Sequence, residues 1–365
     1  MDRESRFVIL ADGQFGPLTS KTANSCIRYM PERVVAVVDS RRAGKKVSDI
    51  LGFGGNIPIK GSLRDALPLA PNALLIGIAP QGGKLPQEWR DTIRLAIENG
   101  LDVWSGLHTF IGDDRELAAL AAEYGVTIHD LRRTPRDLPV AQGRVRNVRA
   151  TVVLTVGSDC NIGKMTAALQ VQNALRSRGR KVAFAGTGQT GILIDGKGIG
   201  VDAVVADFIA GAAERLVIDA AKDADIVLVE GQGSVIHPGY SGVTLGLIHG
   251  SLPNAFIMCT QPSRKHVYNN PWVKMPRISE IIALHEALML HLRPAPTLAV
   301  SLNTYDLSDR AAKDAIRMIE KETGLPTTDP VRYDPTPIAD AVDVFHRKRM
   351  AKLGRSGKKK AARSR

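Results

Sequence analysis

The 365-residue sequence is poor in cysteine, in aromatic residues and in long apolar runs. Its three cysteines, Cys26, Cys160 and Cys259, are widely separated and form no C-x-x-C pair, which argues against a disulfide framework or a cysteine zinc site and favours a reducing cytoplasm. No apolar run approaches the roughly 20 residues that a membrane span needs, so we expect no membrane partner. With 44% hydrophobic residues, a chain of this length predicts two folded domains.

Charge of one sign is concentrated at one end of the chain. The formal net charge is +12, yet residues 347–365 contain ten Lys and Arg and no acidic residue. The other 346 residues carry 39 basic and 37 acidic side chains, so the body is almost neutral. We therefore expect 347–365 to be a disordered basic tail, and we expect nucleic-acid binding, if any, only through it.

Short runs rich in Val, Ile and Leu alternate with longer amphipathic stretches, which is typical of parallel strands joined by helices. Expected strands lie at 7–11, 34–38, 73–79, 101–104 and 126–129, and then at 151–156, 181–185, 226–229, 255–259 and 297–302. The fold class is α/β. We predict a Rossmann-like parallel-sheet domain over 1–135, a linker over 136–150, and a P-loop NTPase-like parallel-sheet domain over 151–335.

A phosphate-binding loop is the strongest motif. The apolar run 151–156 leads into Gly157-Ser158-Asp159-Cys160-Asn161-Ile162-Gly163-Lys164, and a helical stretch follows. A strand, a glycine turn and a helix start together present backbone N–H groups and a lysine to an anion. The expected cofactor-binding residues are Gly157, Ser158, Cys160, Asn161, Gly163, Lys164 and Thr166. Five residues separate the two glycines, one more than in the usual P-loop.

Met165 follows the lysine where nucleotide-hydrolysing P-loops carry the Ser or Thr that binds Mg²⁺. A thioether is a poor ligand for that hard cation. Thr166 lies about 100° further around the helix and does not replace it. The loop is therefore expected to bind a phosphate-bearing cofactor that is not hydrolysed, and no metal is expected.

Two resemblances extend this interpretation. The loop spacing, together with Gln189-Thr190-Gly191 and Glu230-Gly231-Gln232-Gly233, resembles dethiobiotin synthetase over roughly residues 151–260. The strings Gly-Ser-Asp-Cys-Asn-Ile-Gly-Lys-Met-Thr, Gly186 to Gly191, Glu230 to Ser234 with His237-Pro238, and Leu302-Asn303-Thr304 resemble a two-domain family that includes D-glutamate N-acetyltransferases. This second resemblance reaches from the N-terminal region to about Asp329.

The family resemblance implies transfer of acetyl from acetyl-CoA to the amine of D-glutamate, in D-amino-acid catabolism. Coenzyme A would offer phosphates that are bound and not cleaved, which suits the altered loop. An ATP-dependent carboxylase or ligase related to dethiobiotin synthetase is the alternative, and a non-catalytic nucleotide-binding or coenzyme A-binding regulator is the third possibility. A homo-oligomer is expected from such enzymes in general.

The N-terminal half carries a weaker resemblance. The segments Gly61 to Ala66, Ala79 to Lys84 and Trp104 to His108 are similar to the CoA-binding domain of succinyl-CoA synthetase. No G-x-G-x-x-G pattern follows the first expected strand, which argues against nicotinamide binding. A domain that serves packing or dimerisation explains the same pattern equally well.

Acetyl transfer to an amine requires a base and donors for the developing oxyanion. Glu230, at a strand's carboxyl end, is expected to act as base or to orient the substrate, or else to pair with Lys164. Asp159 is expected to contact the amine or to cap the helix. His237 suits proton transfer, although packing is the commoner role of a single histidine.

Substrate-binding residues are expected in the loops that follow the strands of the second domain. A dicarboxylate substrate requires cations, and the loop after 255–259 offers Arg264 and Lys265 for a carboxylate or a coenzyme A phosphate. The other expected substrate contacts are Gln189, Thr190, Gln232 and Ser234.

Overall fold

The structure, a computed structural model, describes residues 5–17, 19–78 and 85–363, and the side chains of this range as far as Gly354. The chain divides into two compact units. Unit 1 consists of Met1–Thr134 and Ile192–Gly196, and unit 2 of Pro135–Gly191 and Lys197–Arg365. The segment Ala79 to Lys84, part of the resemblance to succinyl-CoA synthetase, lies outside the described residues.

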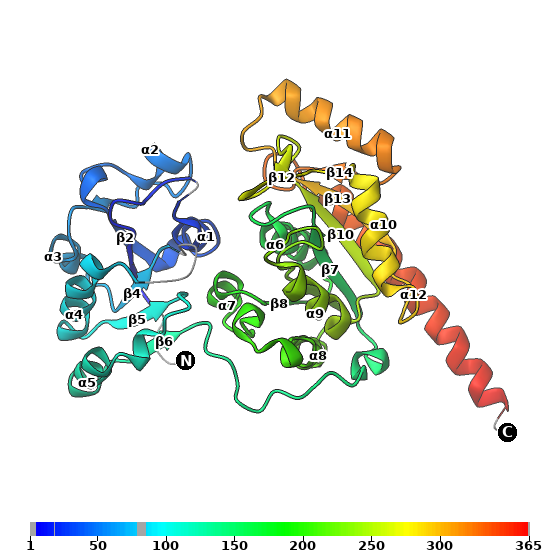
Figure 1. Ribbon diagram of the computed structural model, residues 1–365, viewed down its shortest axis with the longest axis horizontal. Helices are drawn as coiled ribbons and strands as arrows, with labels where there is room; N and C mark the ends of the chain where they lie inside the picture. The colour runs from blue at the N-terminus through cyan, green and yellow to red at the C-terminus, as the bar shows by residue number, and fades with distance from the viewer. Residues whose placement is uncertain (1–4, 18, 79–84, 364–365) are drawn as a thin grey trace. The chain divides into compact units, whose positions relative to one another are not determined.

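Unit 1 is built on a parallel six-stranded sheet in the order β3-β2-β1-β4-β5-β6 (Figure 1). This is the strand order 3-2-1-4-5-6 of the Rossmann fold, so the predicted Rossmann-like domain is confirmed. The strands are β1 (Phe7–Leu10), β2 (Val34–Val38), β3 (Ile59–Lys60), β4 (Ala73–Ile76), β5 (Asp102–Ser105) and β6 (Ile128–Asp130).

Successive side chains along the strands of unit 1 point to opposite faces of the sheet and belong to two hydrophobic cores. Val8 and Leu10 of β1 pack with the helices on one face, and Phe7 and Ile9 pack with those on the other. The first face is covered by α3 (Leu63–Ala66), α4 (Arg90–Glu98) and α5 (Arg115–Tyr124), and the second by α1 (Lys21–Tyr29) and α2 (Val47–Leu51).

Unit 2 contains a second parallel sheet, in the order β14-β13-β10-β7-β9-β8. Its strands are β7 (Thr151–Gly157), β8 (Val182–Ala185), β9 (Ile226–Val229), β10 (Ala255–Thr260), β13 (Thr297–Leu302) and β14 (Thr327–Thr328). A separate antiparallel hairpin joins β11 (His266–Val267) to β12 (Asn270–Lys274). Because all six strands of the sheet run in parallel, the loops after β7, β8, β9 and β10 meet at one edge.

Helices cover both faces of this second sheet. They are α6 (Lys164–Arg176), α8 (Ala206–Ala220), α9 (Ser241–Ser251), α10 (Ile278–Met289), α11 (Asp309–Thr323) and α12 (Thr336–Arg363). The helix α7 (Gln189–Asp195) follows β8, and its residues from Ile192 onward belong to unit 1. Val152, Leu154 and Val156 of β7 share one core with α8, α9 and α10. α6 packs against α12 and also contacts β7. The P-loop domain expected over 151–335 thus has the predicted α/β architecture.

The predicted tail boundary at Arg347 is wrong, because α12 continues through it without a break (Figure 1). The His346 ring Nδ1 lies 2.8 Å from the Thr151 hydroxyl oxygen. Arg349 donates from Nη1 to the carbonyl of Arg149 at 2.6 Å and from Nη2 to that of Val148 at 3.3 Å. Charge composition alone predicts disorder here, but these contacts fix the helix as far as Arg349.

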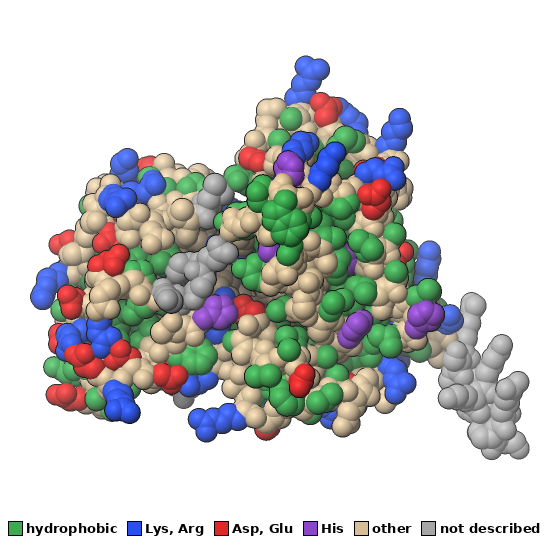
Figure 2. Space-filling view, viewed as in Figure 1, with side chains coloured by type: hydrophobic (Ala, Val, Ile, Leu, Met, Phe, Trp, Pro, Cys, Tyr) green, Lys and Arg blue, Asp and Glu red, His purple; other side chains and the backbone are tan. Residues whose placement is uncertain are grey.

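Charges of both signs are spread over the molecular surface. Figure 2 shows acidic and basic side chains interspersed on the visible face of the described residues, as expected for a body that is almost neutral. Within the part of the chain that was searched, no helix is both long and apolar enough to cross a membrane.

Candidate active site

The loop after β7 has the strand–turn–helix geometry of a phosphate-binding loop. β7 is buried along its whole length, and α6 begins at Lys164 directly after Gly163, whose φ of +99° favours glycine. A Cβ on Gly157 would lie 2.6 Å from Cδ1 of Ile162, so a side chain there would displace Ile162. The backbone N–H groups of the first turn of α6 therefore face the loop.

The Lys164 side chain points back into the loop, whereas the next side chain, that of Met165, is buried. The Lys164 ammonium is buried and donates to the carbonyl of Asp159 at 2.6 Å. Met165 is 6% exposed and belongs to the buried side of α6. The position that carries the magnesium ligand in nucleotide-hydrolysing loops is therefore occupied by a buried apolar side chain.

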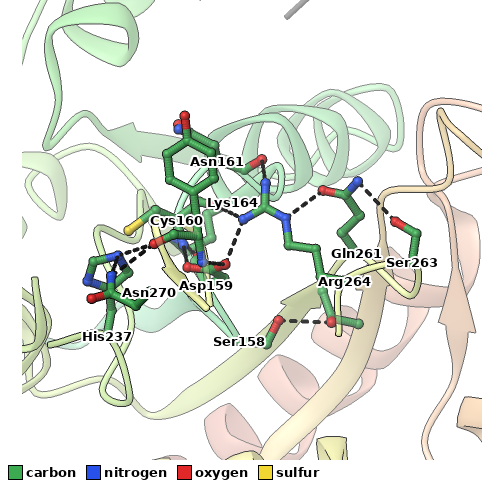
Figure 3. A network of polar contacts seen from close by, with 12 residues as sticks. Ser158, Asp159, Cys160, Asn161, Lys164, His237, Gln261, Ser263, Arg264 and Asn270 are labelled. Atoms are coloured by element: carbon green, nitrogen blue, oxygen red, sulfur yellow. Dashed lines mark hydrogen bonds and ion pairs between the residues drawn. The ribbon is translucent and has the colours of Figure 1, made fainter. Parts of the chain in front are cut away.

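Asp159 and Arg264 form the central ion pair of the site (Figure 3). The Asp159 carboxylate is fully buried, and its Oδ2 accepts from Arg264 Nη1 at 2.7 Å and from the Tyr268 N–H at 2.8 Å. Its Oδ1 accepts from the N–H of Cys160 at 2.7 Å. Asp159 therefore joins the phosphate loop to the segment after β10.

Arg264 makes further hydrogen bonds to the phosphate loop and to Gln261. Nη1 also donates to the carbonyl of Cys160 at 2.7 Å, and Nε donates to Gln261 Oε1 at 3.0 Å. This arrangement makes Arg264 a brace of the loop; its predicted contact with a substrate carboxylate or a coenzyme A phosphate stays a prediction. Lys265, beside it, is exposed, and its predicted contact with the substrate likewise stays a prediction.

Glu230 lies at the carboxyl end of β9 and is 5% exposed. Its Oε2 accepts from the backbone N–H of Thr187 at 2.9 Å and of Gly188 at 3.1 Å, in the loop after β8. A Cβ on Gly191 would lie 2.3 Å from the same oxygen, so only glycine fits beside it. Two charge-assisted hydrogen bonds favour the ionised carboxylate, which suits orienting an ammonium group.

The remaining predicted substrate contacts follow β8 and β9 in the chain. Gln232 donates from Nε2 to the Thr187 hydroxyl at 3.1 Å, and Ser234 accepts from the N–H of Ile236 at 3.4 Å. Gln189 and Thr190, at the start of α7, are 8% and 3% exposed. On the other side of the loop, the Ser158 hydroxyl lies 2.9 Å from that of Thr260.

His237 is held by both ring nitrogens. Nδ1 accepts from the N–H of Gly239 at 3.1 Å, so the neutral ring carries its proton on Nε2, which lies 3.2 Å from the carbonyl of Tyr268. The ring is 3% exposed and packs on Tyr240, with 4.6 Å between ring centroids. In this state His237 is a hydrogen-bond donor, which fits stabilising a negative charge better than accepting a proton.

The structure brings together a group that the sequence does not predict. One ligand atom each from Asp159, Cys160 and His237 lie within 4.8 Å of one another, and Figure 3 shows the Cys160 sulfur beside the His237 ring. A metal ion fits this group poorly, since the Arg264 guanidinium already occupies one Asp159 oxygen. The hairpin residues Tyr268 and Asn270 complete the surroundings; the turn signal at Asn269-Asn270-Pro271 was the available hint.

Comparisons with known proteins cover nearly the whole chain. Residues 40–134 match the Rossmann-like domain of unknown function DUF1611_N, and 139–339 match the P-loop domain of unknown function DUF1611_C. The chain is 39% identical to a DUF1611 family protein from Anabaena variabilis, whose crystal structure superposes with a TM-score of 0.89 over 93% of this chain and 99% of that one.

Two relatives carry the name of an enzyme. The chain is 40% identical over 294 residues to a D-glutamate N-acetyltransferase of Tritonibacter scottomollicae, which covers 80% of this chain and 87% of the relative. It is 35% identical over 272 residues to a D-glutamate N-acetyltransferase of a Pseudoalteromonas species, covering 74% and 81%.

Proposed function

The chain belongs to the DUF1611 family, and from this premise we propose that it is an N-acetyltransferase that moves acetyl from acetyl-CoA to the amino group of D-glutamate. The product is N-acetyl-D-glutamate, and the role is in D-amino-acid catabolism in the cytoplasm. The two relatives named D-glutamate N-acetyltransferase support the substrate and the transferred group. Family membership alone does not fix either.

The observation that carries the proposal is the loop itself. It combines an anion-binding helix start and the buried Lys164 with an apolar residue, Met165, at the magnesium-ligand position. Such a loop binds an anion that is not hydrolysed. Both proposed substrates are anionic: coenzyme A carries phosphates, and D-glutamate carries two carboxylates.

Charged groups next to the loop supply the rest of the chemistry. The Glu230 carboxylate, fixed by the amides of Thr187 and Gly188, orients the substrate ammonium group. His237 offers its Nε2 proton to the oxyanion that develops on the acetyl carbonyl. Gln189, Thr190, Gln232, Ser234 and Lys265 are proposed to contact the substrate.

The test is thiol release from acetyl-CoA by the full-length protein with D-glutamate, L-glutamate and other amino acids in turn. We expect release with D-glutamate and none without an amine beyond a single turnover. Phosphate release from ATP with no thiol release from acetyl-CoA would instead establish the ATP-dependent carboxylase or ligase alternative.

A charge-only substitution tests the site within the same assay. Glu230→Gln keeps an oxygen that accepts from both amides but removes the charge, so we expect kcat/KM for D-glutamate to fall about 100-fold or more with an unchanged fold. Glu280→Gln, on the exposed surface of α10, is the matched control and should keep the wild-type rate.

A further inference from the structure

The three cysteines have different surroundings. Cys26 and Cys259 are fully buried, and burial raises the pKa of each thiol to about 12, so both are inert. Cys160 is partly exposed and lies in the phosphate loop beside the groups that define the site. Of the three cysteines, Cys160 is therefore the one whose thiol can react.

Two cations bind the backbone of the loop at Cys160. It lies just ahead of the N-terminus of the 13-residue helix α6, the Lys164 ammonium bonds the carbonyl of the preceding residue at 2.6 Å, and Arg264 Nη1 bonds the carbonyl of Cys160 itself at 2.7 Å. The nearby carboxylate of Asp159 is neutralised by the same guanidinium. Cations and a helix N-terminus favour the thiolate, which is the nucleophilic form.

His237 lies beside the same sulfur. A ring nitrogen of His237 lies within 4.8 Å of the sulfur, and the Gly239 N–H at Nδ1 leaves the ring proton on Nε2. A thiol beside a histidine ring and just ahead of a helix N-terminus is an arrangement that activates a cysteine nucleophile in acyl transfer. Here the Asp159 carboxylate accepts from Arg264 and from the Tyr268 N–H, so it holds the loop that carries the cysteine.

We propose that Cys160 is the acetyl-accepting nucleophile, and that the acetyl group passes through an S-acetyl-cysteine on its way to the amine. This inference rests on the proposed function. The Cys160 thiolate attacks the acetyl carbonyl carbon, the new S–C bond forms, and the C–S bond to coenzyme A breaks. Coenzyme A leaves with the electron pair and takes a proton from solvent.

The second half-reaction restores the enzyme. The substrate amine, after its ammonium proton has passed to solvent, attacks the S-acetyl carbonyl. The N–C bond forms, the S–C bond to Cys160 breaks, and Cys160 leaves as the thiolate while the second amine proton passes to solvent. One proton is released for each acetyl group transferred, so the whole sequence balances.

The same geometry assigns the anion that the loop binds. In coenzyme A the whole pantetheine arm separates the thioester from the pyrophosphate, so both cannot occupy adjacent residues of one loop. With the thioester at Cys160, the helix start and Lys164 receive a carboxylate of the amino-acid substrate. The coenzyme A phosphates then bind outside the loop, in place of the contacts expected from the sequence.

The direct test is acetyl-CoA added to the full-length protein without an amine. We expect a burst of about one equivalent of thiol per enzyme and one acetyl group on Cys160, found by peptide mass mapping and removed by hydroxylamine. Adding D-glutamate should discharge it as N-acetylglutamate, and steady-state kinetics should show parallel lines. An unlabelled Cys160 with intersecting lines overturns the inference.

Variants separate this inference from the proposed function. Cys160→Ala should lower kcat at least about a thousand-fold, whereas Cys26→Ala should retain the wild-type rate. If Cys160→Ala turns over normally, the inference fails and the acetyltransferase stands; if the wild type releases no thiol with any amine, the proposed function fails. Should Cys160→Ala not fold, methyl methanethiosulfonate on the wild type must abolish activity, and dithiothreitol must restore it.

Lys164→Ala tests the assignment of the anion. We expect KM for D-glutamate to rise about tenfold or more, with KM for acetyl-CoA within about twofold of the wild type. A rise confined to acetyl-CoA would return the coenzyme A phosphates to the loop and overturn the assignment.

Discussion

At the scale of single residues, the site depends on a buried charge that is balanced. Asp159 is fully buried, and its charge is met by one guanidinium, that of Arg264, which is itself 17% exposed. Removing one member of such a pair leaves the other charge buried without compensation. The ion pair of Asp159 and Arg264 therefore holds the phosphate loop in its conformation, and this role matters more than any contact that either residue makes with a ligand.

This view predicts a specific pattern of stability. Arg264→Ala should lower the free energy of unfolding by about 3 kcal/mol, because Asp159 keeps its charge without the guanidinium. Adding Asp159→Asn to that variant should recover part of the loss. Denaturant unfolding of the single and double variants measures both effects. Equal stability of the wild type and Arg264→Ala would show that Arg264 does not brace the loop.

A second buried group predicts how stability depends on pH. His285 in α10 is fully buried; burial lowers the pKa of its ring to about 4, opposed by the carbonyl of Ile281, which accepts from Nδ1. Between pH 6.5, the ordinary pKa, and pH 4, the His285 ring is largely protonated in the unfolded chain and largely neutral in the folded chain. Stability should therefore fall by about 3 kcal/mol as the pH drops from 6.5 to 4.

The measurement is the melting temperature across this pH range. His285→Leu should flatten the acid limb of the curve, while His249→Gln, at an exposed position on α9, should leave its slope unchanged. An acid limb of the same slope in His285→Leu would assign the effect to other groups, of which His346, whose pKa burial also lowers, is the first to examine.

At the scale of elements, the loops after the strands of unit 2 fit together through glycines. Gly191 lies beside the Glu230 carboxylate, and an added Cβ would also lie 3.0 Å from the Phe184 ring. Neither neighbour can retreat easily, since Glu230 is held by two amides and Phe184 is buried in β8. The contact between α7 and β9 therefore requires a residue without a side chain.

Gly191→Ala should consequently displace Glu230 and lower kcat/KM for D-glutamate about tenfold or more, with a loss of about 1–3 kcal/mol in stability. Gly242→Ala is the matched control: it is also a helical glycine near the site, but its added Cβ meets nothing within 4 Å. Acetyl transfer and melting temperature of the two variants decide the matter. Equal behaviour of both would mean that α7 can shift without moving Glu230.

The elements themselves were largely predictable, and the contacts between them were not. β7 and the loop before α6 follow from a buried apolar run, a glycine turn and a helical stretch that are contiguous in sequence. The hairpin β11–β12 was missed because strands of two and five residues give no periodic signal, yet it brings Tyr268 to Asp159. The approach of His237 to Cys160 depends on strand order, which local pattern does not encode.

At the scale of the whole molecule, the boundary between the folded body and the basic end of the chain lies further along the sequence than the composition indicates. Ten basic side chains lie beyond His346, but the first of them extend a helix that is packed on unit 2. Ile338, Ala339 and Val342 are buried, and Arg349 satisfies the carbonyls of Arg149 and Val148. The basic end therefore has an anchored part and, after Gly354, a part that carries six basic residues and no acidic residue.

Two truncations separate these parts. A chain ending at Gly354 should keep the wild-type melting temperature and acetyl transfer but elute from heparin at lower salt, because it loses six positive charges. A chain ending at His346 should lose about 1–3 kcal/mol of stability as well, since two backbone carbonyls lose the Arg349 guanidinium. Its activity per folded molecule should be unchanged, because no site residue lies in α12. Equal stability of the two truncated chains would show that the helix beyond His346 contributes nothing to the fold.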